Sequence, residues 1–310
     1  MSSVDSRLTT VDVLVAIIAA WVFALAACDH KPVASTQPAA SQLRIVSLSP
    51  ALSRTLVDLG LGGSVVGRTP YCSSLDQSIP VVGDLQTIDY EALVRMDPTH
   101  ILVQPPAGGV DPHLVEVARQ RGWAIADWHL NDLEDIRRTL RETPERLYST
   151  ESPQRAEVSR HASDLLADLD SALALPDERP PYRGRTLMVS AVDPVMAFGS
   201  GTYLDDILRA LGGVNVIADR GWVQLSLEDI VRLAPEAIIL VKPGALEVDL
   251  QADLGPLATI GVPANSSGHR ALLAHPDAFL PSSSVAGVAE QMRAILTRFA
   301  ESTIASDNRP

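Results

Sequence analysis

Short apolar runs alternate with amphipathic segments through the first half of the chain. Residues 44–48 predict a buried strand, and Ser49-Pro50 predicts the start of a helix that ends at the glycines of 60–63. Strands that alternate with helices at this spacing indicate parallel β-α-β units. The same pattern predicts further strands over 64–72, 100–104 and 123–129, and further helices from Asp89 to just before Pro98, over 112–122 and over 133–147, the last broken near Pro144.

Residues 152–175 have the pattern of one long amphipathic helix. Ser152-Pro153 marks its start, and the helix ends at Leu175-Pro176. At 1.5 Å per residue it would extend roughly 33 Å, which is enough to cross a whole small domain. Its apolar positions follow i, i+3, i+4, i+7 and i+11 spacing at Ala162, Leu165, Leu166, Leu169 and Leu173.

The second half of the chain repeats the order of the first. A buried strand is predicted over 185–192, a loop over 193–202, and then a helix that Thr202 caps. The tail contains a short segment around 258–265 and a long amphipathic helix over 284–300. Two successive lobes of the same class are therefore expected.

One helix–turn–strand unit occurs twice in nearly the same form. Residues 88–106 and 225–243 align without a gap at an offset of 137 (228 − 91), which places Glu91 on Glu228. A repeat of this kind with two copies indicates a duplicated domain rather than a solenoid. In parallel α/β lobes the ligand crevice lies beyond the carboxyl ends of the strands, so we expect a crevice between the two lobes.

The N-terminus has the pattern of an export signal. Residues 13–27 are an uncharged apolar run of the length of a signal-peptide core, and they end in Leu-Ala-Ala before Cys28. This resembles a bacterial lipoprotein box with Cys28 as the lipidated residue; an uncleaved membrane anchor is the alternative interpretation. The predicted parts are a signal peptide (1–27), a flexible tether (28–42), an N-terminal lobe (43–148), a connecting helix (152–175) and a C-terminal lobe (183–310).

Composition excludes some functions. The formal net charge is −13, and Lys31 and Lys242 are the only lysines, so no basic run could hold nucleic acid. With Cys28 lipidated, Cys72 has no partner for a disulfide within the chain, and the fold must depend on its apolar core.

The order of motifs resembles the class III substrate-binding proteins of ABC importers. The resemblance rests on "RIVSLSPALSRTLVDLGLGGSVVGRTPYC", "PVVGDLQTIDYEALVRMDPTHILV", the connecting helix and "YLDDILRALGGVNVIAD", and it covers nearly all of 43–300. It implies two parallel-sheet α/β lobes joined by a single long backbone helix. It also implies a monomeric, extracytoplasmic receptor that binds a metal chelate, performs no catalysis, has no resident cofactor, and delivers its ligand to an ABC permease dimer with its ATPase. Cobalamin or another corrinoid is favoured; haem and ferric siderophores are the alternatives.

The resemblance also implies a role for the repeated glutamates. In such receptors a glutamate on each lobe docks on arginines of the two permease subunits, and Glu91 and Glu228 match those positions. Two equal carboxylates suit a partner with twofold symmetry. The alternative is local, because a glutamate early in a helix stabilises the helix by about 0.3–1 kcal/mol through the dipole.

Aromatic side chains are scarce at 4 %, so those near the expected crevice are candidates to hold a flat macrocycle. Tyr71 and Trp222 match positions where cobalamin receptors place aromatics. The chain departs from that pattern at Leu85 and Gln104, which weakens the case for cobalamin itself.

Other candidate ligand contacts lie in the second half of the chain. Phe198 and Tyr203 flank a "GSG" turn that lacks the Gly-Lys-Ser/Thr ending of a phosphate loop. Lys242 ends a predicted strand and could meet an anionic group, although an ordinary surface lysine is the simpler interpretation.

No metal or catalytic pattern is found. There is no H-E-x-x-H, no Cys/His zinc spacing and no G-x-S-x-G, so neither a metal centre nor a nucleophile can be assembled. Cys72 or Tyr71 as an axial ligand to a chelated metal stays open beside ordinary packing. An exported enzyme or a scaffolding lipoprotein on the same fold is the alternative class of function.

Overall fold

The first sheet is fully parallel and is built from the first third of the described chain. The computed structural model describes residues 42–84, 86–175, 181–219, 221–244 and 249–307. The strand order is β2-β1-β3-β4, and the two central strands, β1 and β3, are almost fully buried. The strands are β1 (Ile45–Ser47), β2 (Val65–Gly67), β3 (His100–Val103) and β4 (Ala124–Asp127), and the helices between and after them are α2 (Pro50–Asp58), α3 (Tyr90–Met96), α4 (Pro112–Arg121) and α5 (Leu133–Leu147).

The second sheet is mixed, in the order β10-β9-β5-β6-β8, with β7 also paired to β5. The predicted loop over 193–202 is wrong for residues 195–198, because the chain turns at Asp193-Pro194 and returns antiparallel to β5. The strands are β5 (Arg185–Val192), β6 (Val195–Phe198), β7 (Val214–Asn215), β8 (Trp222–Leu225), β9 (Ala237–Pro243) and β10 (Arg270–His275). The predicted α/β fold, two lobes joined by a long helix, is confirmed, but the prediction of a parallel sheet is wrong for the second lobe, because β6 pairs antiparallel with both β5 and β8.

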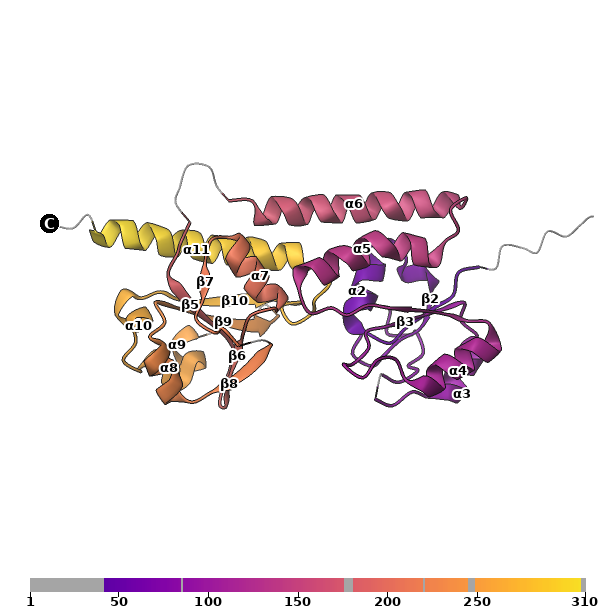
Figure 1. Cartoon of the computed structure of the whole chain (residues 1–310), viewed down its shortest axis with the longest axis horizontal. Helices are drawn as coiled ribbons and strands as arrows, with labels where there is room; N and C mark the ends of the chain where they lie inside the picture. Colours follow the sequence, from indigo (N-terminus) through magenta and orange to yellow (C-terminus); the bar gives the residue numbers. More distant parts are fainter. Residues whose placement is uncertain (1–41, 85, 176–180, 220, 245–248, 308–310) are drawn as a thin grey trace, which may run out of the picture. The chain divides into compact units, whose positions relative to one another are not determined.

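Helices α6 (Pro153–Leu173) and α11 (Val285–Asp307) are the two longest of the described helices. Helix α6 runs beside α5 and α11 and contacts both (Figure 1). Four short helices lie in the second half of the described chain: α7 (Tyr203–Ala210), α8 (Leu227–Leu233), α9 (Leu250–Leu254) and α10 (Pro263–Ser267). Short 3₁₀ turns lie before β2 at Gly62–Ser64 and after α9 at Gly255–Ala258. We call the first sheet with α2–α5 the first lobe, and the second sheet with α7–α11 the second lobe; the residue limits predicted for the lobes stay a prediction.

The predicted break of α5 at Pro144 is wrong. The helix continues to Leu147 with Pro144 inside it. Proline removes one backbone donor and normally disrupts a helix interior. Here it lies within the last turn, and a row of buried side chains along α5 packs into the core, which compensates for one lost hydrogen bond.

The sequence repeat is also a structural repeat. Both α3 and α8 end at a residue with positive φ, Asp97 at 42° and Ala234 at 47°. An arginine binds each helix end: Arg44, just before β1, donates to the carbonyl of Met96, and Arg185, the first residue of β5, donates to the carbonyl of Leu233. The two units therefore share their terminal hydrogen bonds as well as their residues.

Direct hydrogen bonds join the two lobes at two seams. At the first seam Ser283 Oγ donates to Asp58 Oδ2 at 2.6 Å, and Arg54 lies 3.7 Å from Asp277. At the second seam the backbone N–H of Leu133 donates to Asp206 at 3.0 Å. Asp206 is half-buried, and that burial raises its carboxyl pKa above the usual value.

The predicted signal peptide, Cys28 and most of the tether lie outside the described residues. Among the residues that are described, no helix is both long and apolar enough to cross a bilayer.

Candidate functional site

A hollow of about 500 Å³ lies in the first lobe beyond the carboxyl ends of β1, β2 and β3. Its lining includes Ser49, Tyr71 and Gln104, each from the segment that follows one of these strands. Tyr71 is 66 % exposed, more than any other large hydrophobic residue in the described part of the chain. Tyr71 and Gln104, predicted separately, therefore line one hollow.

The second lobe carries an aromatic cluster with one exposed ring. Trp222, the first residue of β8, is 52 % exposed. The centroid of its ring lies 4.3 Å from that of Phe198 and 6.1 Å from that of Phe279. Phe198 pairs with Trp222 across the β6–β8 ladder and is fully buried. Phe198 thus supports the indole from behind, and its direct contact with a ligand stays a prediction.

Phe279 was missed by sequence reasoning. It is partly buried and follows the end of β10, in a segment without a motif. The only available signal was its aromatic type in a chain poor in aromatics. It extends the exposed indole of Trp222 into a wider apolar surface.

The "GSG" turn at 199–201 follows Phe198 directly and forms hydrogen bonds with the segment that precedes Trp222. Gly199 N donates to the carbonyl of Gly221 at 2.7 Å, and Ser200 N donates to that of Asp219 at 2.8 Å. A Cβ on Gly199 would lie 2.1 Å from the Asp219 carbonyl oxygen, so only glycine allows this approach. The turn fixes the segment that leads into Trp222.

Tyr203 and Lys242 have partners inside the protein. The Tyr203 hydroxyl donates to the carbonyl of Ala278, next to Phe279, and burial raises the pKa of this phenol. Lys242 forms an ion pair with Asp253 at 2.9 Å. Tyr203 thus positions the segment that carries Phe279, and a ligand contact for either residue stays a prediction. Leu85 lies outside the described residues.

Cys72 is buried and has hydroxyl neighbours rather than a metal-binding set. Ser53 Oγ donates to its Sγ at 2.9 Å, and Thr69 Oγ1 lies 3.1 Å from the same atom. In the part of the chain that the structure describes, no three His, Cys, Asp or Glu side chains form a metal-binding group. This environment favours the packing interpretation of Cys72.

A polar hollow of about 530 Å³ has walls from both lobes. The first lobe contributes Arg54 and the Ser73-Ser74 pair, two and three residues after Tyr71; the second contributes Asp277, two residues before Phe279. Ser74 Oγ is buried there without a hydrogen-bond partner among the described residues. This hollow connects the chain near Tyr71 with the chain near Phe279.

Glu91 and Glu228 occupy equivalent exposed positions. Each is the second residue of its helix, after the caps Asp89 and Ser226. Neither carboxylate has a hydrogen-bond or ion-pair partner among the residues that the structure describes. Both are therefore free to bind cations of a partner, and their docking role stays a prediction.

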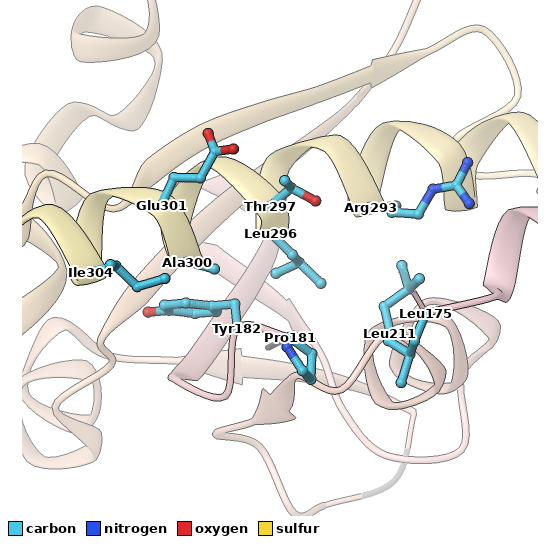
Figure 2. Close-up of a pocket in the computed structure, with 10 residues that line it drawn as sticks. All are labelled: Leu175, Pro181, Tyr182, Leu211, Arg293, Leu296, Thr297, Ala300, Glu301 and Ile304. Carbon is cyan, nitrogen blue, oxygen red and sulfur yellow. The ribbon is translucent and has the colours of Figure 1, made fainter. Parts of the chain in front are cut away.

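A separate apolar hollow lies along α11, lined by Leu175, Tyr182, Leu296 and Ile304 among others (Figure 2). None of the predicted site residues lines it. Beside it the Tyr182 hydroxyl lies 3.2 Å from His269 Nδ1, and burial raises the pKa of Tyr182 to about 12 and lowers that of His269. This cluster fastens the segment before β5 to the start of β10.

Comparison with known proteins identifies the family. The family model described as periplasmic binding protein matches residues 45–254. The chain belongs to the periplasmic binding protein family. Members of this family are substrate-binding proteins of ABC importers, so the class predicted from the sequence is confirmed. The matched relatives are binding proteins, not enzymes.

Curated relatives of this periplasmic binding protein share about a quarter of its residues. The vitamin B12-binding protein of Vibrio cholerae is 25 % identical over 203 residues, which cover 63 % of this chain and 69 % of the relative. That of Salmonella typhimurium is 27 % identical over 228 residues, covering 72 % and 82 %. The Bacillus subtilis ABC transporter substrate-binding lipoprotein YvrC, itself uncharacterized, is 24 % identical over 215 residues, covering 66 % of each chain.

Solved structures show the same fold. The periplasmic vitamin B12-binding protein BtuF of Vibrio cholerae matches with a TM-score of 0.61 at 21 % identity, covering 83 % of this chain and 97 % of that one. The periplasmic heme-binding protein RhuT of Roseiflexus matches with a TM-score of 0.64 at 19 % identity, covering 84 % and 99 %. Receptors named for different ligands thus share this fold, and the ligand must be argued from the site.

Proposed function

We propose that this protein is a lipid-anchored extracytoplasmic receptor that binds a corrinoid between its lobes and delivers it to an ABC importer. One observation carries the proposal. The two most exposed large hydrophobic side chains of the described residues are aromatic, Tyr71 and Trp222, and one stands on each lobe. An exposed aromatic ring costs free energy in water and recovers it when a flat apolar ligand covers it.

The chemistry of the first-lobe hollow supports a corrinoid over an anionic chelate. Its described lining consists of apolar, hydroxyl and amide side chains with one carboxylate, Asp84, and contains no arginine, lysine or histidine. An anionic ligand needs cationic partners when it is desolvated. Corrinoids carry neutral carboxamides, whereas haem and most ferric siderophores carry negative charge. The curated relatives named as vitamin B12-binding proteins agree with this choice.

Delivery uses the paired glutamates and the anchor. Glu91 and Glu228 offer two unpartnered carboxylates in equivalent surroundings, which suits arginines related by the twofold axis of a permease dimer. The anchor is a lipid on Cys28, with residues 28–42 as the tether. The relative YvrC, which is named as a lipoprotein, supports this part of the proposal.

A haem receptor is the second candidate, and the exposed phenol of Tyr71 favours it. The Tyr71 hydroxyl has no hydrogen-bond partner among the described residues, and a tyrosine oxygen is a known axial ligand of haem iron. The described lining of the first-lobe hollow contains no cationic side chain, which argues against haem, because the propionates would be left unpaired.

Titration of the purified full chain separates these candidates. Cyanocobalamin, cobinamide, haemin and a ferric-siderophore panel are each added while absorbance is followed. We expect micromolar or tighter binding of a corrinoid and weaker binding of haemin. Binding of haemin with a shifted Soret band that Tyr71→Phe abolishes would replace the corrinoid with haem. No binding to any member of the panel would refute the proposed function.

A further inference from the structure

The side-chain amide of Gln104 is held in one orientation at the first-lobe hollow. Its Oε1 accepts a hydrogen bond from Ser49 Oγ at 2.9 Å. Ser49 Oγ also accepts from Leu52 N as the N-cap of α2, so its hydrogen is directed to Gln104. The Nε2 group of Gln104 has no partner among the described residues. It is left as an oriented donor in the hollow.

Asp84 offers the complementary group in the same hollow. Its Oδ1 accepts from the backbone N–H groups of Gln86 and Thr87, both at 2.9 Å, which fixes the carboxylate within a tight turn. Its Oδ2 accepts no hydrogen bond from the residues that the structure describes. The hollow therefore presents one amide donor and one carboxylate acceptor, each held by its own backbone segment.

We infer that Gln104 and Asp84 select a ligand that carries a primary carboxamide, with Gln104 donating to its carbonyl oxygen and Asp84 accepting from its NH₂ group. A primary amide carries one acceptor and a two-hydrogen donor, and these are the two kinds of group that an amide N–H and a carboxylate bind. A ligand carboxylate in the same place would face Asp84 with no described cation in the lining to compensate. The inference rests on the proposed function, since corrinoids carry peripheral primary carboxamides.

The test compares two corrinoids that differ at these groups. Cobinamide carries carboxamides, and cobyrinic acid carries carboxylates at the same positions of the ring. We expect the full chain to bind cobinamide at least about tenfold more tightly, since one hydrogen bond is replaced by a repulsive contact. Calorimetry measures both dissociation constants at the same pH and salt concentration.

Two substitutions assign the preference to the two residues. Gln104→Glu keeps an acceptor for Ser49 but removes the donor, so cobinamide affinity should fall roughly three- to tenfold. Asp84→Asn keeps an oxygen for the turn but removes the charge, so the preference for cobinamide over cobyrinic acid should narrow by at least about threefold. The matched control is Gln154→Glu: Ser152 Oγ donates to Gln154 Oε1 at 2.7 Å in the same way, but outside the hollow.

The outcomes separate this inference from the proposed function. Equal affinity of the wild-type chain for both corrinoids overturns the inference and leaves the corrinoid receptor standing. The same holds if cobinamide binds but neither substitution changes affinity or preference relative to Gln154→Glu. If the wild-type chain binds neither corrinoid, both fail. Circular dichroism of each variant confirms that the fold is retained. The comparison of cobinamide with cobyrinic acid on the wild-type chain does not depend on any variant.

Discussion

Replacing Trp222 with alanine removes an exposed indole that we expect a ligand to cover. The side chain is 52 % exposed, and its inner face packs on Phe198. A tryptophan side chain offers about 200 Å², so roughly 100 Å² is available to a ligand. At about 25 cal/mol per Å², covering this area contributes up to about 2.5 kcal/mol to binding. Loss of the whole contribution would weaken binding about seventyfold.

We therefore expect Trp222→Ala to raise the dissociation constant of a corrinoid between tenfold and about seventyfold. Trp222→Phe should retain most of the affinity, because a flat ring remains on the same support. Calorimetric titration of the full chain measures the effect. Val115→Ala is the control, because this residue on α4 is 45 % exposed but lines neither the first-lobe hollow nor the polar hollow between the lobes. Wild-type affinity in a folded Trp222→Ala chain would refute the reasoning.

Three further predictions concern docking, packing and pH. Charge reversal of Glu91 and Glu228 to lysine should abolish stimulation of the permease ATPase with ligand affinity unchanged; a loss of affinity would place these residues at the ligand instead. Gly199→Ala should destabilise the chain by about 1–3 kcal/mol in urea unfolding, because the new Cβ meets the Asp219 carbonyl, and unchanged stability would contradict that geometry. Burial holds the pKa of His269 below its usual 6.5, so the folded chain binds fewer protons than the unfolded chain and loses stability as the pH falls from 6.5 toward that lower pKa. His269→Gln should therefore reduce the fall in thermal midpoint between about pH 7 and pH 5; a pH slope as steep as in the wild type would count against this cause.

The repeated unit could be predicted from the sequence because its signals are local. Asp89 begins its helix as expected, Ser226 caps the equivalent helix of the second copy, and the apolar runs after Pro98 and Pro235 form the buried strands β3 and β9. The equivalent glutamates followed from the same alignment. Capping oxygens and apolar periodicity act within one or two turns of chain, so they need no knowledge of the partner strands.

The second sheet was less predictable because its outer strands depend on distant partners. Strands β6 and β8 are four residues each and pair with each other antiparallel, Phe198 opposite Trp222. Nothing in residues 195–198 alone distinguishes such a strand from a loop. Strand β10 and the placement of Phe279 after it were missed for the same reason, since only the finished sheet brings Phe279 to Trp222.

The candidate site was predicted in part. Tyr71 and Gln104 do line one hollow, but the role of Gln104 depends on Ser49, which lies 55 residues away in sequence. Its amide orientation is set by that one hydrogen bond, and Asp84 enters only because the turn at 84–87 closes on the same hollow. Long-range placement of this kind is decided by strand order, which the sequence pattern does not specify.

Hydrogen–deuterium exchange of the full chain with and without cyanocobalamin tests most directly whether both lobes hold one ligand. We predict slower exchange on ligand binding in segments 69–72 and 103–106 of the first lobe, and at the same time in segments 221–225 and 278–281 of the second. Slower exchange in one lobe only, or in neither, would contradict a ligand held between Tyr71 and Trp222.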